Sequence, residues 1–194
     1  MSSVNLSGQH LQRPRPEESL LLVIDVQERL LPVIADSDAI VERHCELLGG
    51  AKVLGVKTIF SEQYPKGLGS TVTTLWSWIE ESDRNVYSKV AFSFVDAYPE
   101  LLEEFRAAGI RHVILTGVEA HICVYQTARD LLALGFAVTV VSDCVGSREH
   151  SDRDAALLEL RRIGVRVLSS EALLFDLLRE AGTEAFKQIS MLIK

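Results

Sequence analysis

Short apolar runs alternate with longer amphipathic stretches along most of the chain, and this alternation constrains the fold more than any other feature. Runs such as Leu20–Ile24 and Val113–Leu115 contain no polar residue, as is typical of parallel strands that are covered on both faces. The pattern predicts an α/β fold with three α/β/α layers around a doubly wound, six-stranded parallel sheet. The expected strands are 20–24, 56–60, 85–88, 113–115, 137–141 and 165–168, and the expected helices are 36–54, 99–108, 119–134, 150–163, 171–178 and 183–193.

The length of 194 residues and a hydrophobic fraction of 47% predict one globular domain, residues 19–194. Residues 1–18 are polar, carry Pro14 and Pro16, and contain no apolar segment of the kind found in a signal peptide, so we expect a flexible N-terminal arm. The longest nearly unbroken apolar run, 131–141, is too short to cross a bilayer, and no membrane association is expected.

Charge and cysteine content narrow the choice of partners and compartment. The formal net charge of −7 and the lack of a basic run along the sequence argue against nucleic-acid binding. Three cysteines, Cys45, Cys123 and Cys144, are too few for a disulfide framework and favour reduced thiols. We therefore expect a cytoplasmic protein that acts on a small molecule.

Several well-known catalytic and binding signatures are absent from the sequence. It contains no G-x-G-x-x-G, no G-x-x-x-x-G-K-[ST], no G-x-S-x-G, no H-E-x-x-H and no paired C-x-x-C. A dinucleotide enzyme, a P-loop NTPase, a serine hydrolase and a structural zinc site all lose support.

Three chemically complementary residues instead follow three of the predicted strands. Asp25 follows 20–24, Lys89 follows 85–88, and Cys123 lies just after the strand that breaks at Gly117. Because the carboxyl ends of parallel strands share one edge of the sheet, these side chains are expected to converge there. A carboxylate can take the proton of a thiol, an ammonium favours the thiolate, and N–H groups at the start of a helix can stabilise both a thiolate and an oxyanion.

Each member of this trio also has a purely structural interpretation. Asp25 could cap a turn, Lys89 could be a solvated surface lysine, and Cys123 could be a small buried filler. His121 invites a Cys–His interpretation, but side chains two residues apart on a helix do not face each other, so a structural role is favoured.

Three ordered segments resemble the isochorismatase-like cysteine hydrolases, over roughly residues 19–178. They are 23–27 (VIDVQ), 88–93 (SKVAFS) and 116–124 (TGVEAHICV), and the segment 61–69 (SEQYPKGLG) is similar to the isochorismatase-domain-containing subgroup. The resemblance implies a Rossmann-like fold in which Asp25 is the general base, Lys89 the electrostatic partner and Cys123 the nucleophile.

The resemblance also implies a cis peptide bond between Val118 and Glu119, with an oxyanion hole formed by the N–H groups of Glu119 and Cys123. Metal-dependent nicotinamidases of this family carry an Asp-x-His pair and a further His near the second strand. Segment 63–67 (QYPKG) has neither Asp nor His, so no catalytic metal and no cofactor are expected.

The sequence thus predicts a hydrolase that cleaves a C–N bond of a small amide, ureide or carbamoyl compound through a thioester. Gln27, Tyr64, Phe92 and Val118 are the predicted substrate contacts. Isochorismate hydrolysis and a non-catalytic scaffold on the same fold remain as alternatives. A homo-oligomer (dimer, tetramer or larger) is expected, since the apolar stretch Ile189–Ile193 could be an exposed patch that needs a partner.

Overall fold

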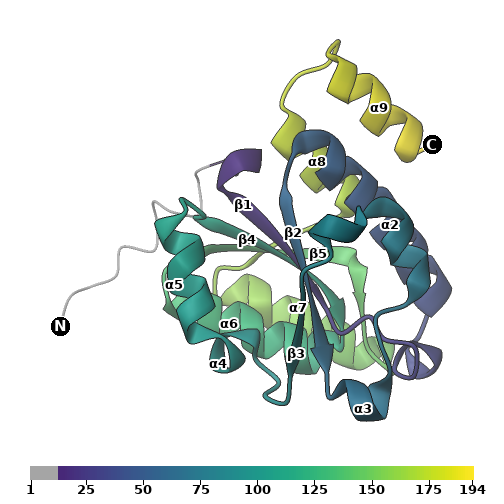
Figure 1. Ribbon diagram of the computed structural model, residues 1–194, viewed down its shortest axis with the longest axis vertical. Helices are drawn as coiled ribbons and strands as arrows, with labels where there is room; N and C mark the ends of the chain where they lie inside the picture. The colour runs from purple at the N-terminus through teal and green to yellow at the C-terminus, as the bar shows by residue number, and fades with distance from the viewer. Residues whose placement is uncertain (1–12) are drawn as a thin grey trace.

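The computed structural model describes residues 13–194, and within them it contains one six-stranded, all-parallel sheet (Figure 1). The strand order is β3-β2-β1-β4-β5-β6, so the chain winds outward in one direction from β1 and in the other from β4. The point where the winding reverses therefore lies between β1 and β4, and open α/β sheets bind ligands at the carboxyl ends of such strands. The strands are β1 (Ser19–Ile24), β2 (Lys57–Gln63), β3 (Val86–Lys89), β4 (His112–Val118), β5 (Ala137–Gly146) and β6 (Arg166–Leu168).

Helices cover both faces of the sheet, which confirms the predicted three-layer α/β/α fold (Figure 1). They are α2 (Ser37–Leu54), α3 (Pro65–Leu68), α4 (Phe94–Ala97), α5 (Pro99–Ala107), α6 (Tyr125–Ala133), α7 (His150–Arg162), α8 (Ser170–Leu178) and α9 (Glu184–Leu192).

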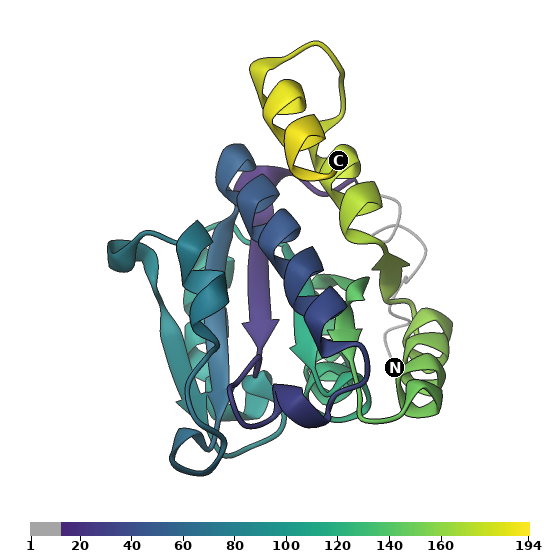
Figure 2. The same cartoon turned by 90° about the vertical axis from the view of Figure 1, so that its right-hand side faces the viewer.

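The side chains of β1 point alternately to the two faces of the sheet, so they join two different apolar clusters. Leu20, Leu22 and Ile24 join one buried cluster with residues of α5, α6 and α7. Leu21 and Val23 join the opposite cluster with residues of α2, α8 and α9, where α8 and α9 pack against α2 (Figure 2). Every residue of β1 is buried, and this explains why the strand has no polar alternation in the sequence.

Three strands extend at least three residues beyond their predicted ends, and β3 extends by one, to Lys89. β2 continues past Phe60 to Gln63, β4 reaches Val118, and β5 continues past Val141 to Gly146. The added residues lie at the carboxyl edge, where polar and glycine residues interrupt the apolar runs that predict a strand.

The predicted helix 119–134 is divided into two parts. Ala120–Val124 forms a π-helical turn, and the regular helix α6 begins only at Tyr125. Cys123 therefore lies in a wide turn rather than in the first turn of an α-helix.

Both ends of the described chain pack on the domain. Residues 1–12 of the expected arm lie outside the described residues. In 13–18, by contrast, Pro14 is buried and its carbonyl oxygen accepts a bond from Arg179 Nη2 (3.3 Å). At the other end, Ile189 is fully buried against α2, so the predicted apolar patch Ile189–Ile193 is wrong at that position, while Met191 is 68% exposed.

No helix within residues 13–194 combines the length and the apolar character that a bilayer crossing requires.

Candidate active site

The three candidate catalytic residues meet at the carboxyl edge of the sheet, at the point where its winding reverses. Asp25 directly follows β1, Cys123 follows β4 in the π-helical turn, and Lys89 ends β3. All three are buried, with 0%, 6% and 3% of their surface exposed. Lys89 Nζ lies 2.8 Å from Asp25 Oδ2, and both groups are close enough to Cys123 to act on its thiol. The arrangement matches the convergence expected from the strand ends.

Gly117 allows β1 and β4 to approach closely at this point. Its φ is +106°, and a Cβ placed on it would lie 1.9 Å from the carbonyl oxygen of Ile24. Only glycine fits both conditions. The residues that follow each strand, Asp25 and the turn that carries Cys123, are thereby brought side by side.

Lys89 is held by three hydrogen bonds, to Asp25 Oδ2 (2.8 Å), Gln63 Oε1 (2.7 Å) and the Phe92 carbonyl oxygen (3.1 Å). An ammonium group has three N–H donors, and all three are used here. Lys89 can therefore act on a ligand through its charge, but it has no N–H left to donate. Asp25 is fixed from its other side, since Ser61 Oγ donates to Asp25 Oδ1 (2.8 Å).

Ser61 and Gln63 were not among the predicted site residues. They lie two positions apart on β2, so both side chains point to the same face of the sheet. There was no strand signal in the sequence there, because residues 61–63 (SEQ) are all polar.

The thiol of Cys123 is protonated at rest. Burial, as the larger cause, and the nearby negative charge of Asp25 together raise its pKa to about 12, while Lys89 acts in the opposite direction. This direction is opposite to the one expected from helix N–H groups, because burial disfavours the charged thiolate. A nucleophilic role for this thiol would require a base, and Asp25 is the carboxylate in contact with it.

The peptide bond between Val118 and Glu119 is cis, as the resemblance implied. The Glu119 N–H donates to no acceptor in the part of the chain that the structure describes. The Glu119 side chain is held separately, since its Oε1 accepts a bond from Arg148 Nε (2.9 Å). A free backbone donor therefore lies four residues before Cys123 in the sequence, in the segment that leads into the π-helical turn.

Tyr64 and Phe92, two of the predicted substrate contacts, each have a backbone atom bonded to Lys89. The Tyr64 N–H donates to the Lys89 carbonyl oxygen (2.8 Å), and the Phe92 carbonyl oxygen accepts from Lys89 Nζ. Their side chains are 55% and 52% exposed, so both are available to a ligand.

Gln27 and Val118, the other two predicted substrate contacts, have structural roles instead. Both N–H groups of the fully buried Gln27 amide are used, by the carbonyl oxygens of Gln63 (3.1 Å) and Gly69 (2.6 Å). The Val118 side chain packs against Ile34 and Ile40 in a small apolar cluster. The sequence could not distinguish these residues from pocket walls, because they adjoin the catalytic segments in the chain.

His121 points to a structural partner, in line with the interpretation favoured from its spacing. Its Nδ1 lies 2.9 Å from Ser147 Oγ, and its Nε2 lies 3.8 Å from Asp152 Oδ2. Within residues 13–194 the structure contains no group of three or more His, Cys, Asp or Glu side chains placed to hold a metal ion.

Comparison with known proteins agrees with this geometry. The isochorismatase domain matches residues 19–172. Isochorismatase domain-containing protein 1 of Danio rerio is 40% identical over 184 residues, which cover 92% of this chain and 62% of that protein. The chain thus spans less than two thirds of that relative's length.

Two solved structures share the fold. One, described as the MAR1 ribonuclease from Caenorhabditis elegans, has a TM-score of 0.86 and 37% identity, with 94% of this chain and 92% of that chain covered. The other, the YcaC gene product of Escherichia coli, is described as an octameric hydrolase of unknown specificity. It has a TM-score of 0.84 and 22% identity, with 93% and 89% covered. Because the isochorismatase domain matches residues 19–172, well over half of the chain, this chain belongs to the isochorismatase-like hydrolase family.

Proposed function

We propose that this chain hydrolyses a C–N bond of a small amide, ureide or carbamoyl compound through a thioester on Cys123. The observation that carries the proposal is the buried Lys89–Asp25 ion pair (2.8 Å) against the Cys123 thiol, at the carboxyl edge of the sheet. A structural ion pair has no need of a thiol beside it, whereas a thiol nucleophile needs both a base and a nearby positive charge.

In the first half of the reaction, Asp25 takes the proton from Cys123 Sγ as the sulfur attacks the substrate carbonyl carbon. The carbonyl oxygen becomes an oxyanion, which the N–H groups of Glu119 and Cys123 stabilise. The C–N bond then breaks, and the leaving nitrogen takes the proton held by Asp25. The products of this half are a free amine or ammonia and a thioester on Cys123.

In the second half, water attacks the thioester carbonyl and Asp25 takes a proton from that water. The C–S bond breaks, the sulfur of Cys123 regains a proton, and the carboxylic or carbamic acid leaves. Lys89 Nζ lies 2.8 Å from Asp25 Oδ2 and supplies the positive charge beside the thiol that a sulfur nucleophile requires.

The test is a screen of primary amides, ureides and carbamoyl compounds for ammonia release, with the thioester sought by mass spectrometry of the intact protein. Cys123→Ala should abolish turnover, and Cys144→Ala is the matched control because Cys144 is a buried thiol outside the site. Turnover retained in Cys123→Ala would exclude the thioester route.

Isochorismate and RNA are the rival substrates, since the family takes its name from the first and a neighbouring structure is described as a ribonuclease. Both belong in the same screen. Cleavage of isochorismate or labelled RNA by Cys123→Ala at the wild-type rate would assign a reaction independent of the thiol. Failure of every substrate, with no thioester, would favour the scaffold alternative.

We also propose that the chain acts as a homo-oligomer. The support is the octameric state described for the Escherichia coli neighbour, together with exposed apolar side chains near Lys89, where Val90 is 79% and Phe92 52% exposed. Light scattering coupled to gel filtration tests this. A monomer at every micromolar concentration contradicts it.

A further inference from the structure

A cavity of about 130 Å³ lies at the amino-terminal edge of the sheet. In its lining, Arg15 precedes β1, Arg111 and His112 lie at the start of β4, and Arg166 is the first residue of β6. The candidate active site lies at the other end of the same strands. Six residue steps along β4 separate the two ends by about 20 Å, at about 3.3 Å per residue. The cavity is therefore separate from the site of Asp25, Lys89 and Cys123.

The cavity carries positive charge that the protein does not neutralise. Four arginines line it, Arg13, Arg15, Arg111 and Arg166, against a single carboxylate, Glu18. Arg166 is paired with Asp176 (2.6 Å), but the other three form no ion pair with any carboxylate of residues 13–194. Residues 1–12 contain no Asp or Glu, so they have no carboxylate side chain to supply. This excess stands out in a chain whose net charge is −7.

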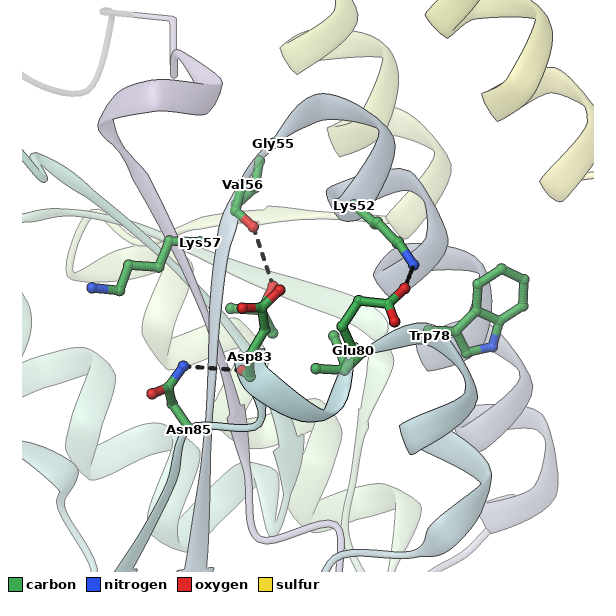
Figure 3. Close-up of a pocket in the computed structure, with 10 residues that line it drawn as sticks. Lys52, Gly55, Val56, Lys57, Trp78, Glu80, Asp83 and Asn85 are labelled. Carbon is green, nitrogen blue, oxygen red and sulfur yellow. Dashed lines mark hydrogen bonds and ion pairs between the residues drawn. The ribbon is translucent and has the colours of Figure 1, made fainter.

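A larger cavity, of about 360 Å³, shows what a balanced lining looks like (Figure 3). Lys52 Nζ there lies 2.5 Å from Glu80 Oε1, and the lining as a whole contains two lysines, Lys52 and Lys57, and two carboxylates, Glu80 and Asp83. That cavity has no surplus charge with which to attract an ion.

The floor of the arginine cavity is a buried chain of hydrogen bonds that fixes the backbone at Arg15. Ser19 Oγ donates to the Arg15 carbonyl oxygen (2.7 Å), so it must accept from Nδ1–H of His112 (3.0 Å). His112 Nε2 then accepts from Thr139 Oγ1 (2.8 Å). Burial and the charge of Arg166 lower the pKa of His112 to about 4, so the ring is neutral at pH 7.

Arg111 is fixed in a similar way. Its N–H donates to the Glu18 carbonyl oxygen (2.9 Å), its carbonyl oxygen accepts from Ala137 (2.9 Å), and its Nη1 caps the carbonyl oxygens of Arg106 (2.7 Å) and Ile110 (2.9 Å). Nε and Nη2 have no acceptor among the described residues. The backbone at two of the arginines is thus fixed, while the side chains of both are exposed and accessible to an anion.

We propose that this cavity binds a phosphate group, either inorganic phosphate or the phosphate of a small monoester. Guanidinium forks match the oxygens of a phosphate in pairs, and a dianion suits the three unpaired arginines. The volume holds several water molecules, and therefore a phosphate-sized anion rather than a stretch of nucleic acid. The sequence showed no basic run because the arginines come from three separate segments, 13–15, 111 and 166.

The test is calorimetric titration of the full chain at low salt with inorganic phosphate, and separately with glycerol 3-phosphate. We expect saturable binding of one anion per chain. Arg15→Ala and Arg111→Ala should each weaken it at least about tenfold, as expected for loss of one charge-assisted contact. Arg161→Ala is the matched control, because Arg161 is an exposed arginine of α7 away from the cavity. Equal affinity for both probes assigns the inorganic ion, and tighter binding of the ester assigns a monoester.

Three outcomes would overturn the proposal. The first is no saturable binding up to about 10 mM, which corresponds to an affinity too weak for a built site. The second is equal weakening by Arg161→Ala and Arg15→Ala, which indicates diffuse attraction. The third is loss of binding in Cys123→Ala with the arginine variants unaffected, which places the anion in the active site. The hydrolase proposal is tested independently, because its experiments do not involve these arginines.

Discussion

At the residue scale, the state of the Cys123 thiol determines how it reacts with a small alkylating agent. Because its pKa is raised to about 12, only a small fraction of the thiol is ionised near neutral pH. As long as the pH stays below the pKa, this thiolate fraction rises about tenfold for each unit by which the pH is raised. We expect the alkylation rate of Cys123 by iodoacetamide, followed by mass spectrometry, to rise about tenfold per unit from pH 7 to 9. A plateau near pH 7 would contradict the raised pKa.

Cys144 serves as an internal control in that experiment. It is fully buried, and burial raises its pKa well above the ordinary value. Alkylation of Cys144 at the rate of Cys123 would mean that the protein had unfolded, so only points at which Cys144 stays unmodified are used.

The ion pair between Lys89 and Asp25 predicts a large loss of stability when one partner is removed. Both side chains are completely buried, and an unpaired charge left behind in such a place costs about 3–5 kcal/mol. Lys89→Met should lower the free energy of unfolding in urea by about that amount. The double variant Asp25→Asn/Lys89→Met should recover part of the loss, since no charge is left unpaired. A double variant less stable than Lys89→Met would refute this account.

The residues that hold this pair show how far the sequence could predict the site. Asp25, Lys89 and Cys123 were predictable because each follows an apolar run, and the sheet edge brings such positions together. Ser61 and Gln63 were not, because the polar end of β2 reads as loop. Gln27 was predicted to contact the substrate because it lies close to Asp25 in the sequence. In the structure, its amide instead donates to the carbonyl oxygen of Gly69, at the end of a turn that the sequence did not connect with Gln27.

At the scale of elements, the close approach of β1 and β4 depends on one residue. A Cβ on Gly117 would lie 1.9 Å from the Ile24 carbonyl oxygen, at a φ of +106°. We expect Gly117→Ala to lose several kcal/mol of stability, or not to yield folded protein, because the backbone of β1 cannot move without displacing Asp25. Gly135→Ala is the matched control, since Gly135 also has a positive φ (+86°) but nothing within 4 Å of its Cβ position.

The control should lose only about 1–2 kcal/mol, which is the cost of the left-handed conformation alone. Thermal unfolding of the two variants separates the loss of stability caused by the positive φ from the loss caused by the contact with the Ile24 carbonyl oxygen. Equal losses would mean that the contact with Ile24 adds nothing.

The interior of each helix and strand was predictable, but several ends were not. A helix from 119 to 134 fits the apolar periodicity, yet the residues Ala120–Val124 form a π-helical turn. Periodicity over five residues cannot distinguish the two windings, because they differ by less than one residue per turn. The position of Cys123 relative to a helix start, and with it the expected thiolate, was therefore beyond what the sequence could specify.

At the scale of the whole molecule, the alternation of strands and helices predicted the layers, while the strand order was visible only in the structure. The order β3-β2-β1-β4-β5-β6 follows from which strands pair across the sheet, and the buried runs of the strands resemble one another too closely to specify their neighbours. The arginine cavity has the same origin, since it collects residues from three segments that are distant in sequence. Features that several distant segments build together are thus the ones that could not be predicted from the sequence.

Two buried histidines in different layers make the stability of the whole domain depend on pH. Burial lowers the pKa of both His44 and His112 to about 4, from about 6.5 in the unfolded chain. Between those values the unfolded chain binds protons that the folded one does not, so stability is complete above pH 6.5 and falls as the pH drops toward 4. Each histidine should remove about 2 kcal/mol from the free energy of unfolding at pH 5, relative to pH 7.5.

Urea unfolding at pH 5 and at pH 7.5 measures this loss, at pH values where carboxylates with ordinary pKa values stay ionised. His44 is the better residue to replace, because its buried Nε2 has no partner within residues 13–194, while its Nδ1 is bonded to the Ile40 carbonyl oxygen (2.8 Å). His44→Gln cannot take up a proton in this range, so it should reduce the loss by about 2 kcal/mol. If the variant and the wild type lose equal stability, the unfolded chain takes up no extra proton at His44, and the acid sensitivity must arise from other groups.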